Sequence, residues 1–493
     1  MPRLGELSGF AGVNRKFRGG TVAGQVTTRT QISGYRFLLR RMEHALVRRD
    51  ARMLADPLRS QNRALAVGLV LAMVGIGGAG ILALLKPQDK VKDSVIAVGR
   101  DSGAMFVRVD DTFHPVLNLA SARLILQDPA EPSIVSEDDL AKYPRGPLLG
   151  IPGAPQTLRV DESDGSAWTV CDTIGDSPRT AVVVGAPAGG QARALTRSQA
   201  MLVRRDSQDY FVYNGARSRI DLSDLAVVRA LGLEGLRPNM VSAGLLNAIP
   251  EAPPITPPVI QASGEASPFL SGRKVGTVVR VVQADRVQHY VVLRDGVQPV
   301  GEAVADLIRF ADSLGAGEIP VVPPDALKNV PAGAGLPVQT YPRSAPEVVD
   351  APVICLSWQP DEGGRVSVLA GAGVPVPAGS RMVARVSPTA AEEGLADDVY
   401  VAPGGGRFVH PVAIRSADAG RPAGSAVFVS DTGVRFGLNS RADAESLGLA
   451  GESAPAPGVM LRLLVPGPAL GHGEAMVAHD SVSAFRPHSR AIR

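Results

Sequence analysis

Cysteine, tryptophan and histidine are scarce in this chain of 493 residues, which has two Cys, two Trp and seven His. It contains no C-x-x-C pair and no H-E-x-x-H motif, so two common zinc-binding patterns are missing. The G-x-x-x-x-G-K-[ST] phosphate loop is also missing, which excludes the P-loop class of nucleotide hydrolases. Aromatic residues make up only 4% of the chain, whereas Gly and Pro number 54 and 40. This balance favours short strands, many turns and Pro-rich linkers over long helices.

Two short strings come close to catalytic motifs but lack the required context. "SGRK" at 271–274 fits the S-x-x-K pattern of penicillin-binding enzymes, but the K-T-G strand and S-D-N loop of that class are absent. "GESAP" at 451–455 lacks the final Gly of a nucleophile elbow. The remaining candidates are interpreted as turns (His114-Pro115, His410-Pro411) or as solvated surface (Asp138-Asp139, Asp397-Asp398). We therefore name no catalytic, cofactor-binding or metal-ligating residue.

One long apolar run decides the class of protein. "ALAVGLVLAMVGIGGAGILALL", residues 64–85, contains no charged residue. At about 1.5 Å per residue a helix of this length spans about 33 Å, enough for a bilayer core of about 30 Å. A cleaved signal peptide does not fit, because the run is too long, starts far from the N-terminus and lacks a small-x-small site. The sequence therefore predicts a single transmembrane helix.

The charge distribution predicts the orientation of this helix. Residues 1–63 hold thirteen Lys and Arg against four Asp and Glu, a net charge of +9, which leaves −6 for the remainder. The positive-inside rule places the N-terminus in the cytoplasm. The bulk of the chain is then expected outside the cytoplasmic membrane.

The segment before the span predicts a basic amphipathic helix. In "SGYRFLLRRMEHALVRRDARMLADP", Leu38, Met42 and Leu46 recur at helical spacing, and Asp56-Pro57 is expected to end the helix. Such a helix beside a bilayer suits either anionic lipid or a cytoplasmic partner, and we do not expect nucleic acid to bind it. The candidate contact residues of this arm are Arg36, Arg40, Arg41, Arg48, Arg49 and Arg52.

The two cysteines are arranged symmetrically with respect to the two tryptophans. Trp168 lies three residues before Cys171, and Trp358 lies three residues after Cys355. The mirrored spacing indicates two strands that meet in one core. An oxidising compartment permits a disulfide between these two cysteines, and two free buried thiols are the alternative.

An internal repeat recurs in the region after the apolar run. "RIDLSDLAVVRALGLEG" (219–235) aligns without a gap with "RFGLNSRADAESLGLAG" (435–451), and weaker copies lie at 105–126 and 289–315. Each is expected to form a hairpin, a helix capped by a polar residue (Ser223 or Asn439) and a Gly stop. The Leu-Gly-Leu ends of the first two copies are interpreted as packing and helix-end geometry.

The expected fold class is α+β: a single transmembrane helix plus a large extracytoplasmic region with a β-rich central domain and four small αβ repeats. Along the chain we expect a basic cytoplasmic arm with an amphipathic helix (1–63), the transmembrane helix (64–85), repeat 1 (90–129), the first half of the central domain (130–193), repeat 2 (194–246), a Pro-rich linker (247–268), repeat 3 (269–317), a second Pro-rich linker (318–344), the second half of the central domain (345–394), repeat 4 (395–452) and a C-terminal segment (453–493).

Several long strings resemble the EccB family of mycobacterial type VII (ESX) secretion systems. They include "SGYRFLLRRMEHALVRRDARMLADPLRSQNRALAVGLVLA", "FHPVLNLASARLIL", "GPLLGIPGAPQ", "WTVCD" and "IDLSDLAVVRALGL". The resemblance implies a single-pass protein of the cell inner membrane with a cytoplasmic N-terminus and a large periplasmic domain. It also places Cys171 and Cys355 where the paired cysteines of the family lie.

The family resemblance implies a structural role in an export machine. The implied partners are an EccC-type FtsK-like ATPase, the EccD multispan subunit, the EccE subunit and the mycosin protease, together with further copies of the chain. The alternatives are periplasmic nucleotide hydrolysis and anchoring to peptidoglycan, which the similarity of the repeats to cell-wall-binding modules suggests. No cofactor is implied.

Overall fold

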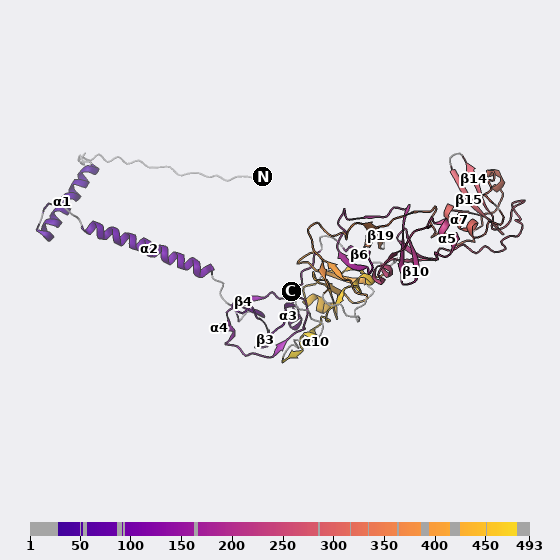
Figure 1. Ribbon diagram of the computed structural model, residues 1–493. Helices are drawn as coiled ribbons and strands as arrows, with labels where there is room; N and C mark the ends of the chain where they lie inside the picture. Colours follow the sequence, from indigo (N-terminus) through magenta and orange to yellow (C-terminus); the bar gives the residue numbers. More distant parts are fainter. Residues whose placement is uncertain are drawn as a thin grey trace, which may run out of the picture. The chain divides into compact units, whose positions relative to one another are not determined.

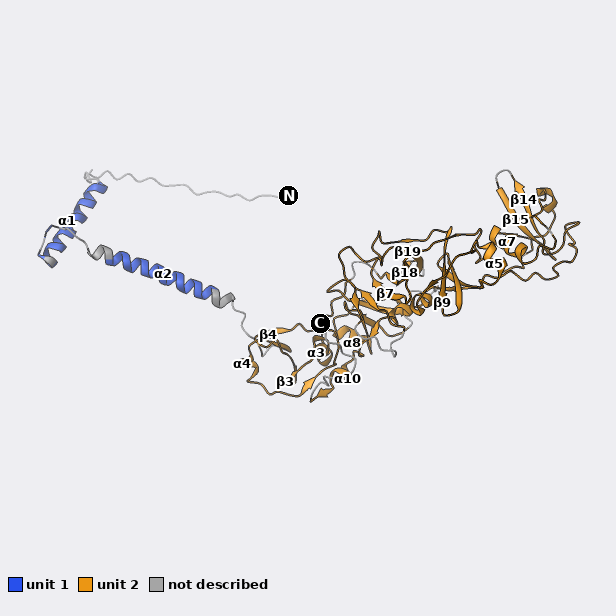
Figure 2. Cartoon of the chain, in the orientation of Figure 1, with its two compact units in different colours: residues 1–88 blue, residues 89–493 orange. Residues whose placement is uncertain are grey.

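The computed structural model describes residues 28–480 except 50, 53–56, 86–90, 92–93, 162–165, 284–285, 316, 334, 362–363, 386–393, 415–423 and 450. The chain divides into two compact units, residues 1–88 and 89–493, which Figure 2 shows in different colours. The start of the cytoplasmic arm and the end of the C-terminal segment lie outside the described residues.

Unit 1 contains two helices, α1 (Arg29–Arg48) and α2 (Pro57–Leu85), drawn in indigo and violet in Figure 1. At the start of α1, the side chain of Gln31 accepts a hydrogen bond from the backbone N–H of Thr28 at 3.0 Å. The helix ends at Arg49, which has a left-handed φ of 55°. The prediction that Asp56-Pro57 ends this helix is wrong: Pro57 begins α2, where the N–H that proline lacks has no helical acceptor.

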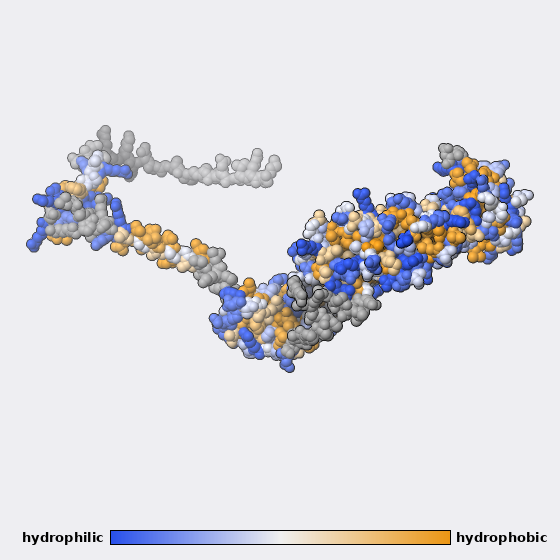
Figure 3. Space-filling view, in the orientation of Figure 1, coloured by the Kyte–Doolittle hydropathy of each residue, from blue (hydrophilic) through white to orange (hydrophobic). Residues whose placement is uncertain are grey.

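Helix α2 has the length and composition of a membrane span. The segment Gln61–Ile81 has a mean hydropathy of 2.2, and none of it is buried in the structure. Figure 3 shows it as a band of apolar side chains. All of the predicted span, residues 64–85, is helical.

Unit 2 repeats one motif four times, in which three consecutive antiparallel strands are followed by a helix. The third strand was not expected, since the sequence predicted only a hairpin before each helix. The four motifs are β1 (Ile96–Gly99), β2 (Met105–Val109), β3 (Thr112–Pro115) and α3 (Leu119–Leu126); β9 (Gln199–Arg205), β10 (Gln208–Tyr213), β11 (Ala216–Ile220) and α5 (Leu225–Ala230); β14 (Val278–Gln283), β15 (Arg286–Leu293), β16 (Gly296–Val300) and α7 (Glu302–Ala311); and β22 (Arg407–Val412), β23 (Val427–Val429), β24 (Val434–Gly437) and α8 (Arg441–Ser446).

Repeats 2 and 4 share a longer pattern than the sequence comparison found. Their sheets have the equivalent orders β12-β9-β10-β11-β13 and β25-β22-β23-β24-β26, with both outer strands parallel to their neighbours. Along the chain, a short helix follows the first outer strand and precedes the second in each repeat. These helices, α6 and α9, contact each other. The added elements are β12 (Asn239–Met240), α6 (Ala243–Ala248) and β13 (Glu251–Ala252), and β25 (Ala454–Pro457), α9 (Gly458–Leu461) and β26 (Val465–Pro466). The sheet of repeat 4 therefore extends into the expected C-terminal segment.

The Leu-Gly-Leu strings end helices α5 and α8, as expected. Gly232 and Gly448 have φ of +65° and +85°, a conformation that suits glycine. The next residues, Leu233 and Leu449, are buried, and their N–H groups return to the helix at Val228 O (2.8 Å) and Ala444 O (2.9 Å). The strings therefore have a packing role.

The predicted N-caps are wrong by one residue. Asp224 caps α5 by accepting from Ala226 N at 2.9 Å, because Ser223 instead donates to Asp221. Ser440 caps α8 by accepting from Asp443 N at 3.1 Å, because Asn439 instead donates to Glu474.

The central sheet has seven strands, in the order β20-β21-β7-β6-β18-β19-β8. Its strands come from both expected halves of the central domain. Strand β21 differs from the expected division, because it lies in the range assigned to repeat 4 but joins this sheet. The strands are β6 (Trp168–Thr173), β7 (Arg179–Val184), β8 (Ala192–Ala194), β18 (Val353–Gln359), β19 (Arg365–Gly371), β20 (Val383–Ala384) and β21 (Asp398–Tyr400).

The remaining elements are short. They are β4 (Ser133–Val135), α4 (Glu137–Leu140), β5 (Leu148–Leu149), η2 (Pro324–Leu327), β17 (Glu347–Val348), α10 (His472–Ala475) and β27 (Ala478–His479). Strand β27 pairs with β5, and α10 packs against α3, so the end of the described chain returns to repeat 1.

The cores show which repeats pack together. Helices α5 and α7 pack closely, and Leu231 and Leu307 share one core between repeats 2 and 3. Leu124 of α3 and Leu447 after α8 share another core between repeats 1 and 4. The central sheet and helices α6 and α9 form a third core around the two tryptophans.

Candidate functional site

The structure describes the side chains of five of the six candidate arginines of the arm. Arg36, Arg40 and Arg41 are exposed along α1, and Arg49 and Arg52 are exposed at and beyond its end. The side chain of Arg48 lies outside the described residues. Another set of exposed side chains recurs every three or four residues and so shares one face of α1: Ile32, Tyr35, Leu39, Met42 and Leu46. Helix α1 is therefore amphipathic, with an apolar face that no other described residue buries, and it precedes the apolar helix α2 in the chain.

The central sheet contains the disulfide Cys171–Cys355, which the residues alone left open against two free thiols. The two residues lie directly opposite each other on β6 and β18, with their Cα atoms 4.0 Å apart. Both cysteines are fully buried and pack with Val353 and Leu369.

Trp168 and Trp358 also lie directly opposite each other on β6 and β18. Because they are three positions from the cysteines, the pleat points them to the other face of the sheet. Both are fully buried, and each indole N–H has a partner: Ser166 Oγ at 3.2 Å and Ile414 O at 3.1 Å. The pair of strands therefore contributes a disulfide to one core and two indoles to another.

Asp172, on the same face as the tryptophans, is the buried carboxylate that joins α6 to the central sheet. It accepts from the backbone N–H of Ser242 (2.6 Å), the hydroxyl of Ser242 (2.9 Å) and the hydroxyl of Thr180 (2.9 Å). Burial raises the pKa of Asp172, whereas these hydrogen bonds act in the opposite direction. Ser242 in turn caps α6, so the carboxylate fixes the start of this helix.

The pair Asp397-Asp398 is not solvated surface as predicted. Asp398 forms an ion pair with Arg179 at 2.8 Å, and Asp397 accepts from the backbone N–H of Thr180 at 2.8 Å. Both carboxylates hold β21 against β7, because their partners lie at the start of that strand.

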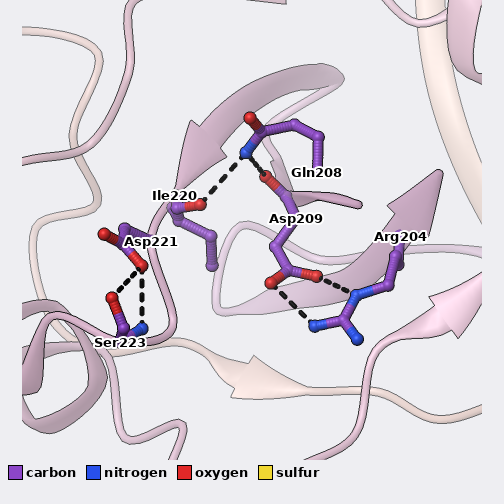
Figure 4. A network of polar contacts seen from close by, with 6 residues as sticks. All are labelled: Arg204, Gln208, Asp209, Ile220, Asp221 and Ser223. Atoms are coloured by element: carbon purple, nitrogen blue, oxygen red, sulfur yellow. Dashed lines mark hydrogen bonds and ion pairs between the residues drawn. The ribbon is translucent and has the colours of Figure 1, made fainter. Parts of the chain in front are cut away.

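A polar network organises repeat 2 (Figure 4). The guanidinium of Arg204 binds both carboxylate oxygens of Asp209, at 2.6 and 2.9 Å. The side-chain amide of Gln208 donates to the carbonyls of Asp209 and Ile220 at 3.0 and 3.3 Å. Gln288 of repeat 3 does the same with His289 and Val300 at 3.0 and 3.2 Å, so repeats 2 and 3 share the glutamine contacts of this network.

Asp221 forms the other part of this network. The hydroxyl and the backbone N–H of Ser223 donate to its carboxylate at 2.6 and 2.8 Å. These hydrogen bonds hold the pKa of Asp221 below its ordinary value. The interaction closes the turn between β11 and α5.

Repeat 4 contains a cavity of about 580 Å³ between α8, strand β22 and the segments that precede β23 and β25. Its apolar lining includes Phe408, Leu438, Ala444 and Leu449, and polar side chains of Asn439, Ser440, Arg441, Glu445, Glu452 and Ser453 surround it. A second cavity of about 410 Å³ adjoins it and shares the lining residues Phe408, Leu449, Gly451 and Glu452.

His410 and Ser453 meet at the first cavity. The Nδ1 atom of His410 lies 2.9 Å from the hydroxyl of Ser453, and its Nε2 atom is buried without a hydrogen-bond partner. No carboxylate of the described residues bonds to Nε2, so the pair lacks the third group of a hydrolytic triad. Among the described residues, no group of three or more His, Cys, Asp or Glu is placed to hold a metal ion.

The histidine–proline dipeptides lie in strands and not in turns as predicted. His114-Pro115 ends β3, an edge strand, where the missing N–H of proline costs no ladder hydrogen bond. His410-Pro411 lies in β22, beyond the three residues that pair with β23. The strand can therefore contain Pro411 and still present His410 to the cavity.

The comparisons with known proteins assign the family. Residues 24–484 match the family model of the type VII secretion system ESX-1 transport TM domain B, EccB. This chain belongs to the EccB family. It is 40% identical to the ESX-3 secretion system ATPase EccB3 of Mycolicibacterium smegmatis over 92% of this chain and 91% of that protein. It is 38% identical to the ESX-2 secretion system ATPase EccB2 of Mycobacterium tuberculosis over 93% of this chain and 96% of that protein.

Solved EccB structures have the same fold. A chain of the intact ESX-5 inner membrane complex matches with a TM-score of 0.74 at 34% identity, covering 96% of this chain and all of that one. A chain of the EccB3 dimer from the ESX-3 core complex matches with a TM-score of 0.69 at 39% identity, covering 78% of this chain and all of that one. The recognition of EccB from the arm, the span and the repeat strings is confirmed.

Proposed function

We propose that this EccB family member is a structural membrane subunit of a type VII (ESX) secretion complex, and that it anchors and oligomerises the part of the machine outside the cytoplasm. The observation that carries the proposal is the match over 96% of the chain to a subunit of an intact ESX-5 inner membrane complex. The single apolar helix and the disulfide-linked β core fit an anchored scaffold.

Charge and redox chemistry support the proposed orientation. Residues 1–63, which precede the apolar run, have a net charge of +9, which favours the cytoplasmic side. The disulfide Cys171–Cys355 lies in unit 2, and disulfides persist in oxidising compartments such as the periplasm. We therefore assign the arm to the cytoplasm and unit 2 to the periplasm of a single-pass inner-membrane protein.

The proposed partners are the EccC-type FtsK-like ATPase, EccD, EccE, the mycosin protease and further copies of this chain. The structural relatives come from an inner membrane complex and from an EccB3 dimer, which supports a multi-subunit setting and self-association. Within the arm, the proposed contacts with a partner or with anionic lipid are Arg36, Arg40, Arg41, Arg48, Arg49 and Arg52, of which the first three are exposed along α1.

Gentle detergent extraction of the tagged full-length protein tests this function. We expect native electrophoresis and mass spectrometry to recover it in a large assembly with the ATPase and the multispan subunit. A variant with Arg36, Arg40 and Arg41 replaced by Gln should keep the span and lose part of the assembly. Recovery of the unchanged protein alone, even after crosslinking, contradicts the scaffold function.

Nucleotide hydrolysis is a second candidate, because the related EccB3 and EccB2 proteins are named as ATPases. The sequence lacks a phosphate loop, so we do not favour this activity. A turnover assay on the purified protein, with heat-denatured protein as the control, tests it. Sedimentation with purified peptidoglycan tests wall anchoring independently.

A further inference from the structure

Repeats 1 and 3 contain a shorter form of the outer segments that extend repeats 2 and 4. In repeat 3, Val321 lies parallel beside Arg280 of β14, and Ala332 lies parallel beside Val297 of β16. Helix η2 lies between these two segments in the chain, as α6 lies between β12 and β13. In repeat 1, β4 runs parallel to β1, α4 follows it, and β5 then contacts β3. The helices α4, α6, η2 and α9 are therefore the equivalent second helices of repeats 1, 2, 3 and 4.

The first and second helices cover opposite faces of each repeat sheet. In β14, for example, Val278 packs in the cluster that contains α7, whereas the next residue, Val279, packs in the cluster that contains Leu327 of η2. Successive residues of a strand point to opposite faces, so α7 and η2 lie on the two sides of this sheet. Each repeat therefore has a first-helix face and a second-helix face.

Like faces meet wherever two repeats are in contact. Helix α3 contacts α8, and α5 contacts α7, so repeats 1 and 4, and repeats 2 and 3, meet through their first-helix faces. Repeats 4 and 2 meet through their second-helix faces, because α9 contacts α6. The contacts thus follow the series 1-4-2-3. The second-helix faces of repeats 1 and 3 are its two ends, and the apolar cluster on each contains residues of that repeat alone among those described.

The second-helix face of repeat 2 shows what such a face contacts when it is covered. Leu245 and Leu246 of α6 are 0% and 5% exposed, and they share a core with Met460 and Leu461 of α9 and with the central sheet. The partner of this face is therefore another second-helix face of the same motif, next to a sheet that both helices cover.

The second-helix face of repeat 3 keeps apolar surface uncovered. We call this surface the η2 face and define it by Tyr290, Pro324, Ala326, Leu327 and Val330. Tyr290, Leu327 and Val330 pack over the buried valines of the sheet but are only half-buried. Pro324 and Ala326 of η2 are exposed. Burial of apolar surface is the main driving force of protein association, so this face suits a protein contact.

We propose that the η2 face is an interface with the η2 face of a second copy of this chain, an inference that rests on the proposed function as an oligomeric subunit. A contact between two identical faces needs groups that are complementary within one face. Asp325 and Lys328 supply them: both are exposed, and their spacing of three residues places them on one side of a 3₁₀-helix. An antiparallel, two-fold contact brings Asp325 of each copy to Lys328 of the other.

The opposite end of the series, at repeat 1, does not suit a contact of this kind. Helix α4 contains Glu137, Asp138 and Asp139, and only Lys142 follows to balance them. Two copies of this face repel each other through their like charges. The apolar residue of α4, Leu140, is 1% exposed and so offers no surface to a partner. A polar outer face of this kind closes a series of repeats, as terminal units of repeat proteins do.

Oxidative crosslinking of the full-length protein in its own membranes tests the interface. The variant Ala326→Cys adds a thiol to η2, while Cys171 and Cys355 are bonded to each other. We expect mild oxidation to give a covalent dimer. The matched control is Ala141→Cys, at an exposed alanine directly after α4, which should give little dimer. A dimer from the control and none from Ala326→Cys overturns the proposal in favour of the repeat 1 end. Crosslinking of Ala326→Cys only to a different protein overturns it in favour of that partner.

Exchange of the two charges tests the two-fold geometry. In the Ala326→Cys protein, the further change Asp325→Lys should lower the yield of dimer about threefold or more, because the exposed charge pairs between copies become repulsive. Addition of Lys328→Asp should restore the yield, since each copy again offers one charge of each sign. Equal yields from all three proteins, or no recovery in the last one, contradict this contact.

Recovery of the large assembly distinguishes this inference from the proposed function. The Ala326→Cys protein is extracted gently from the same membranes, and the ATPase and the multispan subunit are sought with it. An intact assembly without a dimer on oxidation leaves the scaffold function standing and overturns the η2 contact. Recovery of the unchanged protein alone overturns the scaffold function, and the inference that rests on it fails as well.

Discussion

Trp168 and Trp358 lie directly opposite each other on β6 and β18, three positions along the ladder from the paired Cys171 and Cys355. In an antiparallel pair, a step forward on one strand is matched by a step backward on the other. A Trp three residues before one Cys therefore faces a Trp three residues after the other. One register accounts for both pairs.

Removal of the disulfide should destabilise unit 2 strongly. In the chain-entropy account, a crosslink over a separation of 184 residues stabilises the fold by about 5 kcal/mol. We expect the variant Cys171→Ala/Cys355→Ala to unfold at a clearly lower urea concentration than the oxidised protein. Reduction of the unchanged protein should give the same shift, and the double variant should not respond to reductant. A variant as stable as the oxidised protein contradicts this account.

The two indoles should contribute as core residues. Replacement of Trp168 with Ala leaves a cavity in the core between the central sheet and α6, and we expect a loss of about 3–5 kcal/mol in the free energy of unfolding. Trp168→Phe should cost less, because most of the volume remains. The exposed substitution Val259→Ala is the control and should change the free energy of unfolding little, since Val259 is 90% exposed. A similar loss in all three variants argues against a specific role of Trp168.

Asp172 should make stability fall as pH rises in the acidic range. Burial raises its pKa in the folded state, so the folded protein holds this proton at pH values where the unfolded chain has lost it. Its contribution to stability is therefore fully present below the ordinary pKa of Asp and decreases as pH rises through the raised pKa. Asp172→Asn cannot titrate. We expect the free energy of unfolding of the unchanged protein, relative to that of this variant, to be higher at acidic pH than at neutral pH. A difference independent of pH contradicts the raised pKa.

Glu137 of α4, which accepts hydrogen bonds from the turn between β1 and β2 of repeat 1, should have the opposite effect. The backbone N–H of Ser102, followed by its hydroxyl and the N–H of Asp101, lowers the pKa of Glu137 to about 2. The stabilisation is therefore present above the ordinary pKa of Glu and is lost as pH falls toward about 2. Hydrogen exchange of the Asp101 and Ser102 amides should show protection at neutral pH that decreases in acid. Glu137→Gln should reduce this protection at neutral pH and remove its pH dependence. Unchanged protection in this variant contradicts the interpretation.

The sequence predicted those features that follow from local spacing. The apolar run at 64–85 identified the span, and the gap-free match between 219–235 and 435–451 identified two related units. Glycine at 232 and 448 predicted helix ends, because few other residues adopt the required φ. The caps were misplaced by one residue since Ser223-Asp224 and Asn439-Ser440 each offer two capping side chains. The choice between them depends on a local contact of Ser223 with Asp221 and on a tertiary contact of Asn439 with Glu474.

The cavity of repeat 4 was not predictable in this way. His410 and Ser453 are 43 residues apart, and they meet only because β25 runs parallel to β22. Each taken alone is an ordinary polar residue beside a proline or a glycine-rich turn. The string "GESAP" contains Ser453 within an incomplete nucleophile-elbow motif. The residue that Ser453 contacts at the cavity, His410, lies in a different strand, β22.

The position of the disulfide has a consequence for the integrity of the chain. Repeats 2 and 3 leave the central sheet after β7 and β8 and return at β18, so the bond between Cys171 and Cys355 makes this whole excursion a covalent ring. A protease that cuts once inside the ring, for instance in the Pro-rich linkers 247–268 or 318–344, does not separate the membrane anchor from the C-terminal strands. The nicked molecule remains a single covalent object, with both flanking repeats attached, until the sulfur–sulfur bond is reduced.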